Sequence, residues 1–327
     1  MTPIQNRMCV LAGIVCGVAV ALPSSAQGYP DRPIQLVIPY AAGGGTDVLA
    51  RQVAEALSHR LGQKVVPDNR PGAGTAVGAA AVARAAPNGY TLLFSTLAHS
   101  LNATMNPKLG FDPLNDFEFV GRVGEGQLFI MVNMQYVKVD DLRGLVTLMR
   151  DKNEKVAFGS AGMGSPMHLA GESLKQATKV DAVHVPYKGE VPALADLLGG
   201  QLTFMMCSIS ACGPHIKDGK LKALAVMAQK RSPFAPQVPT TAEAGFPGVE
   251  MNTWYFVAAP KGTPAAVVTK LNQALNEVLA DESFKARVYA MGVELETRTT
   301  PAGTRAFVQS EIEKWRPVIK TSGAIVE

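Results

Sequence analysis

The sequence contains few of the side chains from which metal centres are built. It has 5 histidines and 4 cysteines in 327 residues, and neither an H-E-x-x-H nor a C-x-x-C spacing occurs. A metal site would have to be assembled from positions with no recognisable spacing. We therefore predict that the protein holds no metal and no other cofactor.

Aromatic residues are also scarce, at 6%, and the lysines and arginines are scattered along the chain. A nucleic-acid surface needs a basic patch together with rings that stack on bases, and neither pattern is present. A formal charge of +4 on a chain of this length adds no argument for such a partner. We predict no nucleic-acid partner.

The sequence also lacks the motifs of phosphate, dinucleotide and acyl-transfer sites. No glycine loop is followed by G-K-[ST], no G-x-S-x-G occurs, and the run at 159–164, G-S-A-G-M-G, is not in the G-x-G-x-x-G order. These absences argue against ATP, NAD and esterase chemistry.

Long hydrophobic runs are absent except at the start of the chain. Residues 8–22 are apolar and follow the single charge of Arg7, and small residues lead up to Ala26. This pattern is typical of a secretory signal peptide at 1–26, cleaved after Ala26. We expect export to the periplasm, where the remaining Cys207 and Cys212 form either a small disulfide or two buried thiols.

The rest of the chain alternates short apolar strands with helical segments, which is typical of parallel α/β layers. The alternation starts afresh after 117–123 and 128–132, which we read as two strands separated by Gly-Glu-Gly. We predict two α/β lobes, each a mostly parallel sheet flanked by helices, with a ligand cleft between them. Their predicted bounds are 29–126 plus 253–327 for the first lobe and 127–252 for the second.

The stretch at 38–47, I-P-Y-A-A-G-G-G-T-D, joins a predicted strand to a predicted helix through three glycines. Glycine lets successive backbone N–H groups converge, and Thr46 or Asp47 is suited to cap the helix. We expect an anion-binding turn here. Its candidate residues are Tyr40, Ala41, Gly44, Gly45, Thr46 and Asp47.

Two further loops carry small polar residues. One follows the strand predicted at 91–94, and the other is the glycine-rich segment 159–165. Because parallel strands end at one edge of a sheet, the three loops are expected to converge in the cleft as a neutral, hydrogen-bonding pocket for a carboxylate. The alternative is that each loop is an ordinary strand–helix turn. The candidate residues of these two loops are Ser95, Thr96, His99, Ser160, Ala161, Gly164 and Ser165.

Three side chains have competing interpretations. Tyr187 lines the cleft or belongs to the core, and Lys188 neutralises an anion or lies in a solvated turn. His168 follows Ser165 by three residues, so it either forms a Ser/His pair or packs under the glycine loop and hydrogen-bonds it. We favour the second interpretation of His168.

Motifs in a fixed order cover nearly the whole chain after residue 26: P-Y-A-A-G-G-G-T-D at 39–47, N-R-P-G-A-G at 69–74, A-P-N-G-Y-T-L at 86–92, G-S-A-G-M-G-S at 159–165, V-P-Y-K-G at 185–189 and L-L-G-G-Q at 197–201. They resemble those of the Bug (TctC-type) periplasmic solute-binding proteins of tripartite tricarboxylate transport systems. The resemblance implies a two-lobed periplasmic binding protein of the type II-like kind that closes on a small carboxylate. It also implies a monomer that works with membrane permease subunits.

In this family the carboxylate is held largely by backbone N–H groups and bridging waters. The resemblance places these contacts at Ala41, Gly44, Gly45, Thr46, Asp47, Ser160, Ala161, Gly164 and Ser165. This chain departs from the family at Thr203, where an acidic residue is usual, and at Cys207-Ser208, where an Asp-Asn type pair is common. If the missing acid would have met an ammonium group, the ligand here is a plain carboxylic acid rather than an amino acid.

The sequence thus predicts an exported, non-catalytic receptor for a small organic acid. Two alternatives stay open: a secreted hydrolase that uses Ser165 and His168, and a receptor that feeds a sensor rather than a transporter.

Overall fold

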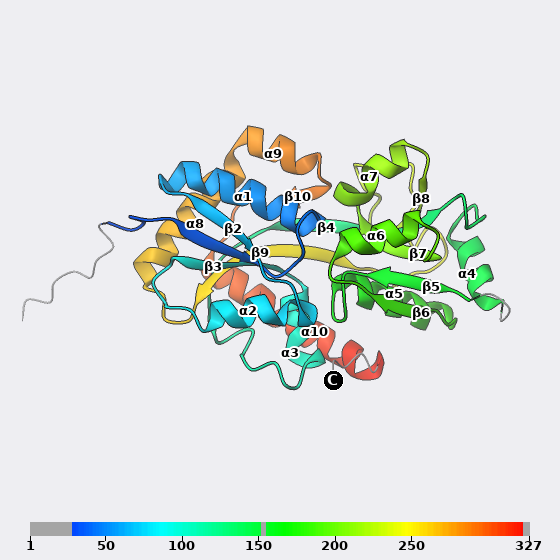
Figure 1. The fold of residues 1–327 in the computed structure, drawn as a ribbon, viewed down its shortest axis with the longest axis horizontal. Coiled ribbons are helices and arrows are strands. Elements are labelled where there is room, and N and C mark those ends of the chain that lie inside the picture. The colour runs from blue at the N-terminus through cyan, green and yellow to red at the C-terminus, as the bar shows by residue number, and fades with distance from the viewer. Residues whose placement is uncertain (1–27, 152–154, 323–327) are drawn as a thin grey trace, which may run out of the picture.

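The computed structural model describes residues 28–151 and 155–322, so the predicted signal peptide at 1–26 lies outside the described residues. Two α/β lobes lie side by side, and the long strands β4 (Phe117–Asn133) and β9 (Asn252–Pro260) run between them (Figure 1). The two-lobed architecture predicted from the strand–helix alternation is confirmed.

The first lobe contains a sheet with the strand order β2-β1-β3-β9-β4. Its first three strands are parallel, β9 is antiparallel to both β3 and β4, and β10 pairs with β4. The sheet is therefore mixed rather than mostly parallel. The elements of this lobe other than β4 and β9 are β1 (Ile34–Ile38), α1 (Gly45–Leu61), β2 (Val65–Asn69), a 3-10 turn (Ala73–Thr75), α2 (Ala76–Ala83), β3 (Thr91–Thr96), α3 (Ala98–Met105), α8 (Ala265–Ala280), α9 (Glu282–Tyr289), β10 (Val293–Leu295) and α10 (Pro301–Ser322).

The second lobe continues the sheet through the far half of β4. There β4 pairs antiparallel with β7 and β8, and β7, β5 and β6 are parallel to one another. Its elements are α4 (Leu142–Arg150), β5 (Ala157–Ser160), α5 (Pro166–Thr178), β6 (Val183–Pro186), α6 (Glu190–Leu198), β7 (Phe204–Ser208), α7 (Ile209–Lys217) and β8 (Leu221–Val226).

The prediction of two strands separated by Gly-Glu-Gly at 124–126 is wrong, because β4 is one strand of 17 residues. The glycines belong to the strand, where Gly124 pairs with Leu295 of β10. A Cβ at Gly124 would lie 2.3 Å from the backbone oxygen of Glu294. Glycine is used here for the close approach of a neighbouring strand and not for a turn.

The change of partner along β4 indicates where the lobes divide. This strand pairs with β9 as far as Gln127 and with β7 from Leu128 onward. We propose that the first lobe comprises 29–126 and 253–327 and that the second comprises 127–252, with the crossings at β4 and at the start of β9.

Each lobe has apolar side chains packed on its sheet. In the first lobe, Leu36 and Phe94 of the sheet lie in one buried cluster with Leu49 of α1 and Leu275 of α8. Together these contacts fix the start of α1 beside the end of β1, which is where the glycine loop lies. In the described part of the chain no helix is long and apolar enough to cross a membrane.

A helix glycine tests the packing of the second lobe. A Cβ at Gly171 in α5 would lie 2.1 Å from the ring of Phe158, so Gly171→Ala should destabilise the protein by about 1–3 kcal/mol through overpacking. The control is Gly213→Ala in α7, where the nearest atom would be 3.8 Å away and the change should be neutral or stabilising. Chemical denaturation measures both, and equal stabilities for the two variants would contradict the packing described.

Candidate functional site

A small cavity of about 40 Å³ lies between the lobes. Most of its lining comes from the ends of strands and the starts of helices. The first lobe contributes Tyr40, Ala41, Gly44, Gly45, Thr46, Thr96, Thr253 and Tyr255, and the second contributes Leu128, Ala161, Ser165, Pro166, Met167, Glu190 and Ser208. The predicted convergence of the three loops is therefore seen, although the second loop contributes only Thr96 to this lining.

Four helices begin at this cavity. They are α1 at Gly45, α5 at Pro166, α6 at Glu190 and α7 at Ile209, which follows the lining residue Ser208. The first N–H groups of a helix have no partner within the helix, and the helix dipole makes this end positive. The cavity therefore offers a favourable environment for negative charge without a cationic side chain.

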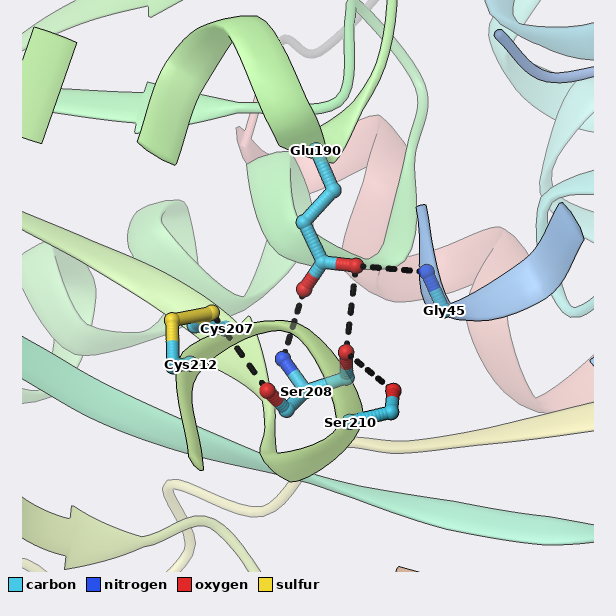
Figure 2. Close-up of a disulfide and its surroundings, with 6 residues drawn as sticks. All are labelled: Gly45, Glu190, Cys207, Ser208, Ser210 and Cys212. Carbon is cyan, nitrogen blue, oxygen red and sulfur yellow. Dashed lines mark hydrogen bonds between the residues drawn. A yellow bond between two sulfur atoms is a disulfide. The ribbon is translucent and has the colours of Figure 1, made fainter. Parts of the chain in front are cut away.

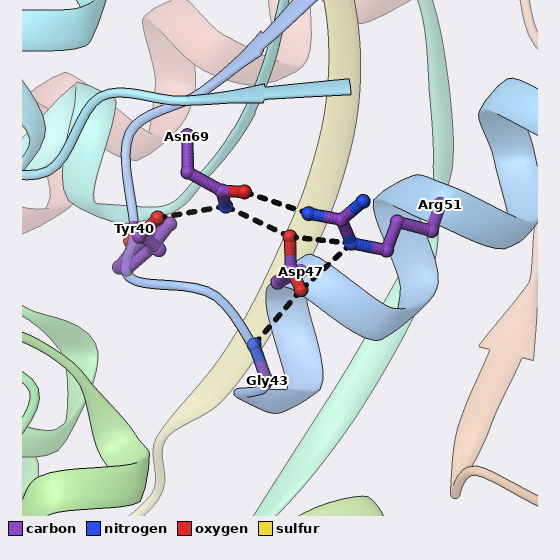
Figure 3. A network of polar contacts seen from close by, with 5 residues as sticks. All are labelled: Tyr40, Gly43, Asp47, Arg51 and Asn69. Carbon is purple, nitrogen blue, oxygen red and sulfur yellow. Dashed lines mark hydrogen bonds and ion pairs between the residues drawn. The ribbon is translucent and has the colours of Figure 1, made fainter. Parts of the chain in front are cut away.

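The glycine loop is held in shape by Asp47, whose side chain is only 3% exposed (Figure 3). Its Oδ2 accepts the N–H of Gly43 at 2.8 Å, and its Oδ1 accepts the side-chain amide of Asn69 at 2.8 Å. Arg51 donates to the same carboxylate at 2.9 Å. The predicted cap by Thr46 or Asp47 is wrong in detail, because the N-cap is Gly44, which has no side chain to bond the helix start.

The residue that sequence reasoning missed is Glu190, whose carboxylate crosses from the second lobe to the first (Figure 2). The residue is 6% exposed, and its Oε2 accepts the backbone N–H of Gly45 at 3.1 Å. On its own side of the cleft, its Oε1 accepts the N–H of Ser208 at 2.7 Å and its Oε2 accepts the Ser208 hydroxyl at 3.1 Å.

Glu190 overturns two expectations. An acidic side chain lines the pocket, which was expected to offer only neutral groups, and it comes from the start of α6 rather than from Thr203 or Cys207-Ser208. An ammonium group on the ligand therefore has an acidic partner available in the pocket. Burial raises the pKa of Glu190, and the hydrogen bonds from Ser208 and Gly45 oppose that shift.

Two tyrosines close the first-lobe side of the cavity. The hydroxyls of Tyr40 and Thr96 lie 2.6 Å apart in a hydrogen bond, and Tyr255 stacks on Phe94 with ring centroids 6.0 Å apart. Burial raises the pKa of both phenols, so they remain protonated at neutral pH.

Ser165 and His168 do not form a catalytic pair. The Ser165 hydroxyl caps α5 by accepting the backbone N–H of His168 at 3.2 Å, and the His168 ring accepts the N–H of Gly164 at 3.2 Å. That ring stacks on His184 with centroids 4.0 Å apart, and burial lowers its pKa to about 4. The interpretation in which His168 packs under the loop and hydrogen-bonds it is confirmed.

The remaining predicted residues surround the cavity or lie away from it. The ring of His99 is fully buried between Phe117 and Phe256, and its Nε2 lies 2.8 Å from the backbone oxygen of Pro113, so it belongs to the core. Ser95 is likewise fully buried in β3. Ser160 supports its loop through bonds to His184 and Gly162.

Tyr187 and Lys188 lie in a neighbouring groove of about 530 Å³ that shares Tyr40, Ala161 and Ser165 with the cavity. The hydroxyl of Tyr187 donates to Asp196 at 2.6 Å, and Lys188 is exposed. Neither side chain lines the cavity beside Glu190.

Cys207 and Cys212 form a disulfide with Cα atoms 6.2 Å apart, which resolves the two alternatives left by the sequence. Cys207 is fully buried and does not line the cavity, whereas its neighbour Ser208 does. The bridge closes the short segment that presents the Ser208 N–H to Glu190 (Figure 2).

Comparison with known proteins identifies close relatives over the whole chain. The model of the family described as tripartite tricarboxylate transporter family receptor matches residues 49–324. The protein BugT of Bordetella pertussis is 37% identical over 323 residues, which cover 98% of each chain. The structure of the periplasmic binding protein BugD has a TM-score of 0.88 and 36% identity, covering 91% of this chain and 100% of that one. MatC from Rhodopseudomonas palustris, solved with bound malate, has a TM-score of 0.84 and 34% identity, covering 89% and 100%.

The Asp47 network provides a test of the loop. Asp47→Ala leaves the Gly43 N–H without its acceptor and removes one of the two acceptors of the Asn69 amide, so it should cost about 1–3 kcal/mol of stability and weaken ligand binding. The control is Asp140→Ala, which removes an exposed carboxylate.

The pH dependence of stability checks the same network. Burial works to raise the pKa of Asp47, but bonds from Arg51, Gly43 and Asn69 hold it below the ordinary value of 3.8. Its contribution is therefore fully present at neutral pH and is lost as the pH falls through the folded-state pKa. Asp47→Ala should lack this acid-dependent loss, and an unchanged acid-unfolding profile would contradict the role.

Proposed function

The chain belongs to the tripartite tricarboxylate transporter family of receptors, and we propose that it captures a small carboxylate between its two lobes. The observation that carries this proposal is the convergence of four helix N-termini on one interlobe cavity. Main-chain N–H groups bind a carboxylate without a fixed cation, and they hold it without transforming it. Malate bound to the related MatC supports this ligand class.

Capture works by closure of the lobes about β4 and β9. Gly45 lies so close to the second lobe that a Cβ there would be 2.6 Å from the Ser210 hydroxyl and 2.7 Å from that of Ser208. Contacts of this kind exist only when the lobes are together, so a ligand that adds to them shifts the population toward the closed form.

The cellular setting follows from the family. We propose that the signal peptide at 1–26 directs the protein to the periplasm and that the closed receptor acts there as a monomer. It then delivers its ligand to membrane permease subunits of a tripartite tricarboxylate transporter.

The function can be tested by thermal shift with a library of small carboxylates. A ligand at 100 times its dissociation constant should stabilise the folded protein by about 2.7 kcal/mol. Gly45→Val should abolish this stabilisation, because the added side chain meets Ser208 and Ser210 and holds the lobes apart.

The matched control is Gly28→Val, because a Cβ at Gly28 would meet nothing within 4 Å. This variant should respond to the same carboxylates as the unmodified protein. A Gly45→Val variant that keeps its affinity would refute the assignment of the site.

A further inference from the structure

The carboxyl group of Glu190 is a fixed part of the ligand cavity. Three donors from the protein hold it in place: the N–H of Gly45, the N–H of Ser208 and the Ser208 hydroxyl (Figure 2). Two of these are backbone groups that can only donate, so the arrangement suits an ionised carboxylate. The cavity therefore already holds one carboxyl group, which carries a negative charge when it is ionised, before any ligand enters.

The helix N-termini around the cavity set a limit on further negative charge. Each N-terminus is equivalent to roughly half a positive charge, so the four together balance about two negative charges. The carboxylate of Glu190, when ionised, accounts for about one of these two negative charges, because it lies at the start of α6 and accepts hydrogen bonds from the starts of α1 and α7. The partial positive charge that remains lies chiefly at Thr46 of α1 and at the start of α5. It balances about one further negative charge.

Side chains do not raise this limit. Among the described residues that line the cavity, none is lysine, arginine or histidine. Arg51 is paired with Asp47, and Lys188 is exposed in the neighbouring groove. A second ligand carboxylate would thus lie near Glu190 with no opposite charge, and unpaired buried charge is strongly unfavourable.

We propose that Glu190 makes this receptor selective for acids with a single carboxylate and excludes dicarboxylates. The inference rests on the proposed function and specifies its ligand class. The ligand carboxylate binds the free N–H groups at the start of α1 and the hydroxyl of Ser165. The rest of the molecule lies against the apolar side chains of Leu128, Pro166 and Met167.

This selectivity sets the chain apart from two of its relatives, one of which is Rpa4515 of R. palustris, solved with the dicarboxylate adipate at 34% identity. MatC, at 34% identity, is known with malate, which carries two carboxylates. If the resident carboxylate is the cause, its removal alone should open the cavity to dicarboxylates.

The experiment is calorimetric titration of the full mature chain with matched pairs of acids. Each pair consists of a straight-chain monocarboxylate and the dicarboxylate with the same number of carbons, and the pairs run from three to eight carbons. The unmodified protein should bind the best monocarboxylate at least ten-fold more tightly than its dicarboxylate counterpart. Glu190→Gln should reduce that ratio at least ten-fold, chiefly by tighter binding of the dicarboxylate.

The matched control is Glu282→Gln in α9, where the side chain is 85% exposed. This variant should keep the ratio of the unmodified protein. Glu190→Ala serves as a second variant if Glu190→Gln does not fold, with melting temperatures recorded for all proteins.

Dicarboxylates that bind the unmodified protein as tightly as monocarboxylates would overturn the inference and leave the proposed function intact. An unchanged ratio in both Glu190 variants would also overturn it. If no acid of either kind binds the unmodified protein or the variants, the proposed function fails together with the inference.

Discussion

The contact on which the site depends is the hydrogen bond from the backbone of Gly45 to the carboxylate of Glu190, which joins the two lobes. It requires a residue without a side chain at Gly45, since a Cβ there would meet Ser208 and Ser210. It also requires that the carboxylate of Glu190 be positioned within its own lobe. The N–H of Ser208 does this by donating a hydrogen bond to it. The disulfide between Cys207 and Cys212 closes the segment that carries this N–H.

Neighbouring contacts position the glycine loop that donates this hydrogen bond. Asp47 fixes the glycine loop by bonding the N–H of Gly43, and the same carboxylate is tied to Arg51 and Asn69. Side-chain contacts therefore support the conformation of this glycine-rich loop. The strand β4 pairs with β9 in the first lobe and with β7 in the second, so a continuous strand rather than a flexible linker joins the lobes.

Much of this organisation was predictable because it depends on local patterns. The strand–glycine–helix order at 38–47, the second glycine loop at 159–165 and the two-lobed layout all follow from apolar periodicity and glycine placement. The loop role of His168 was predicted from its spacing after Ser165. Those features involve residues that are neighbours in sequence.

Other features depend on partners far away in the chain, and these were missed. The Gly-Glu-Gly segment at 124–126 looks like a turn until β10 is placed beside it. His99 looks like a site residue until Phe117 and Phe256 enclose it. Glu190 was overlooked because the N–H groups of Gly45 and Ser208, which bring its carboxyl group into the site, lie far from it in the sequence.

The sequence by itself determined the class of protein and the kind of site, because strand–helix alternation and glycine loops are local properties of the chain. Only the tertiary structure placed an acidic side chain in that site. Gly45 and Glu190 are 145 positions apart, and the hydrogen bond between them arises only where the two lobes meet. An acidic side chain of one lobe joins the binding site of the other lobe only when the chain folds. No local sequence pattern indicates which distant N–H group its carboxyl group will contact.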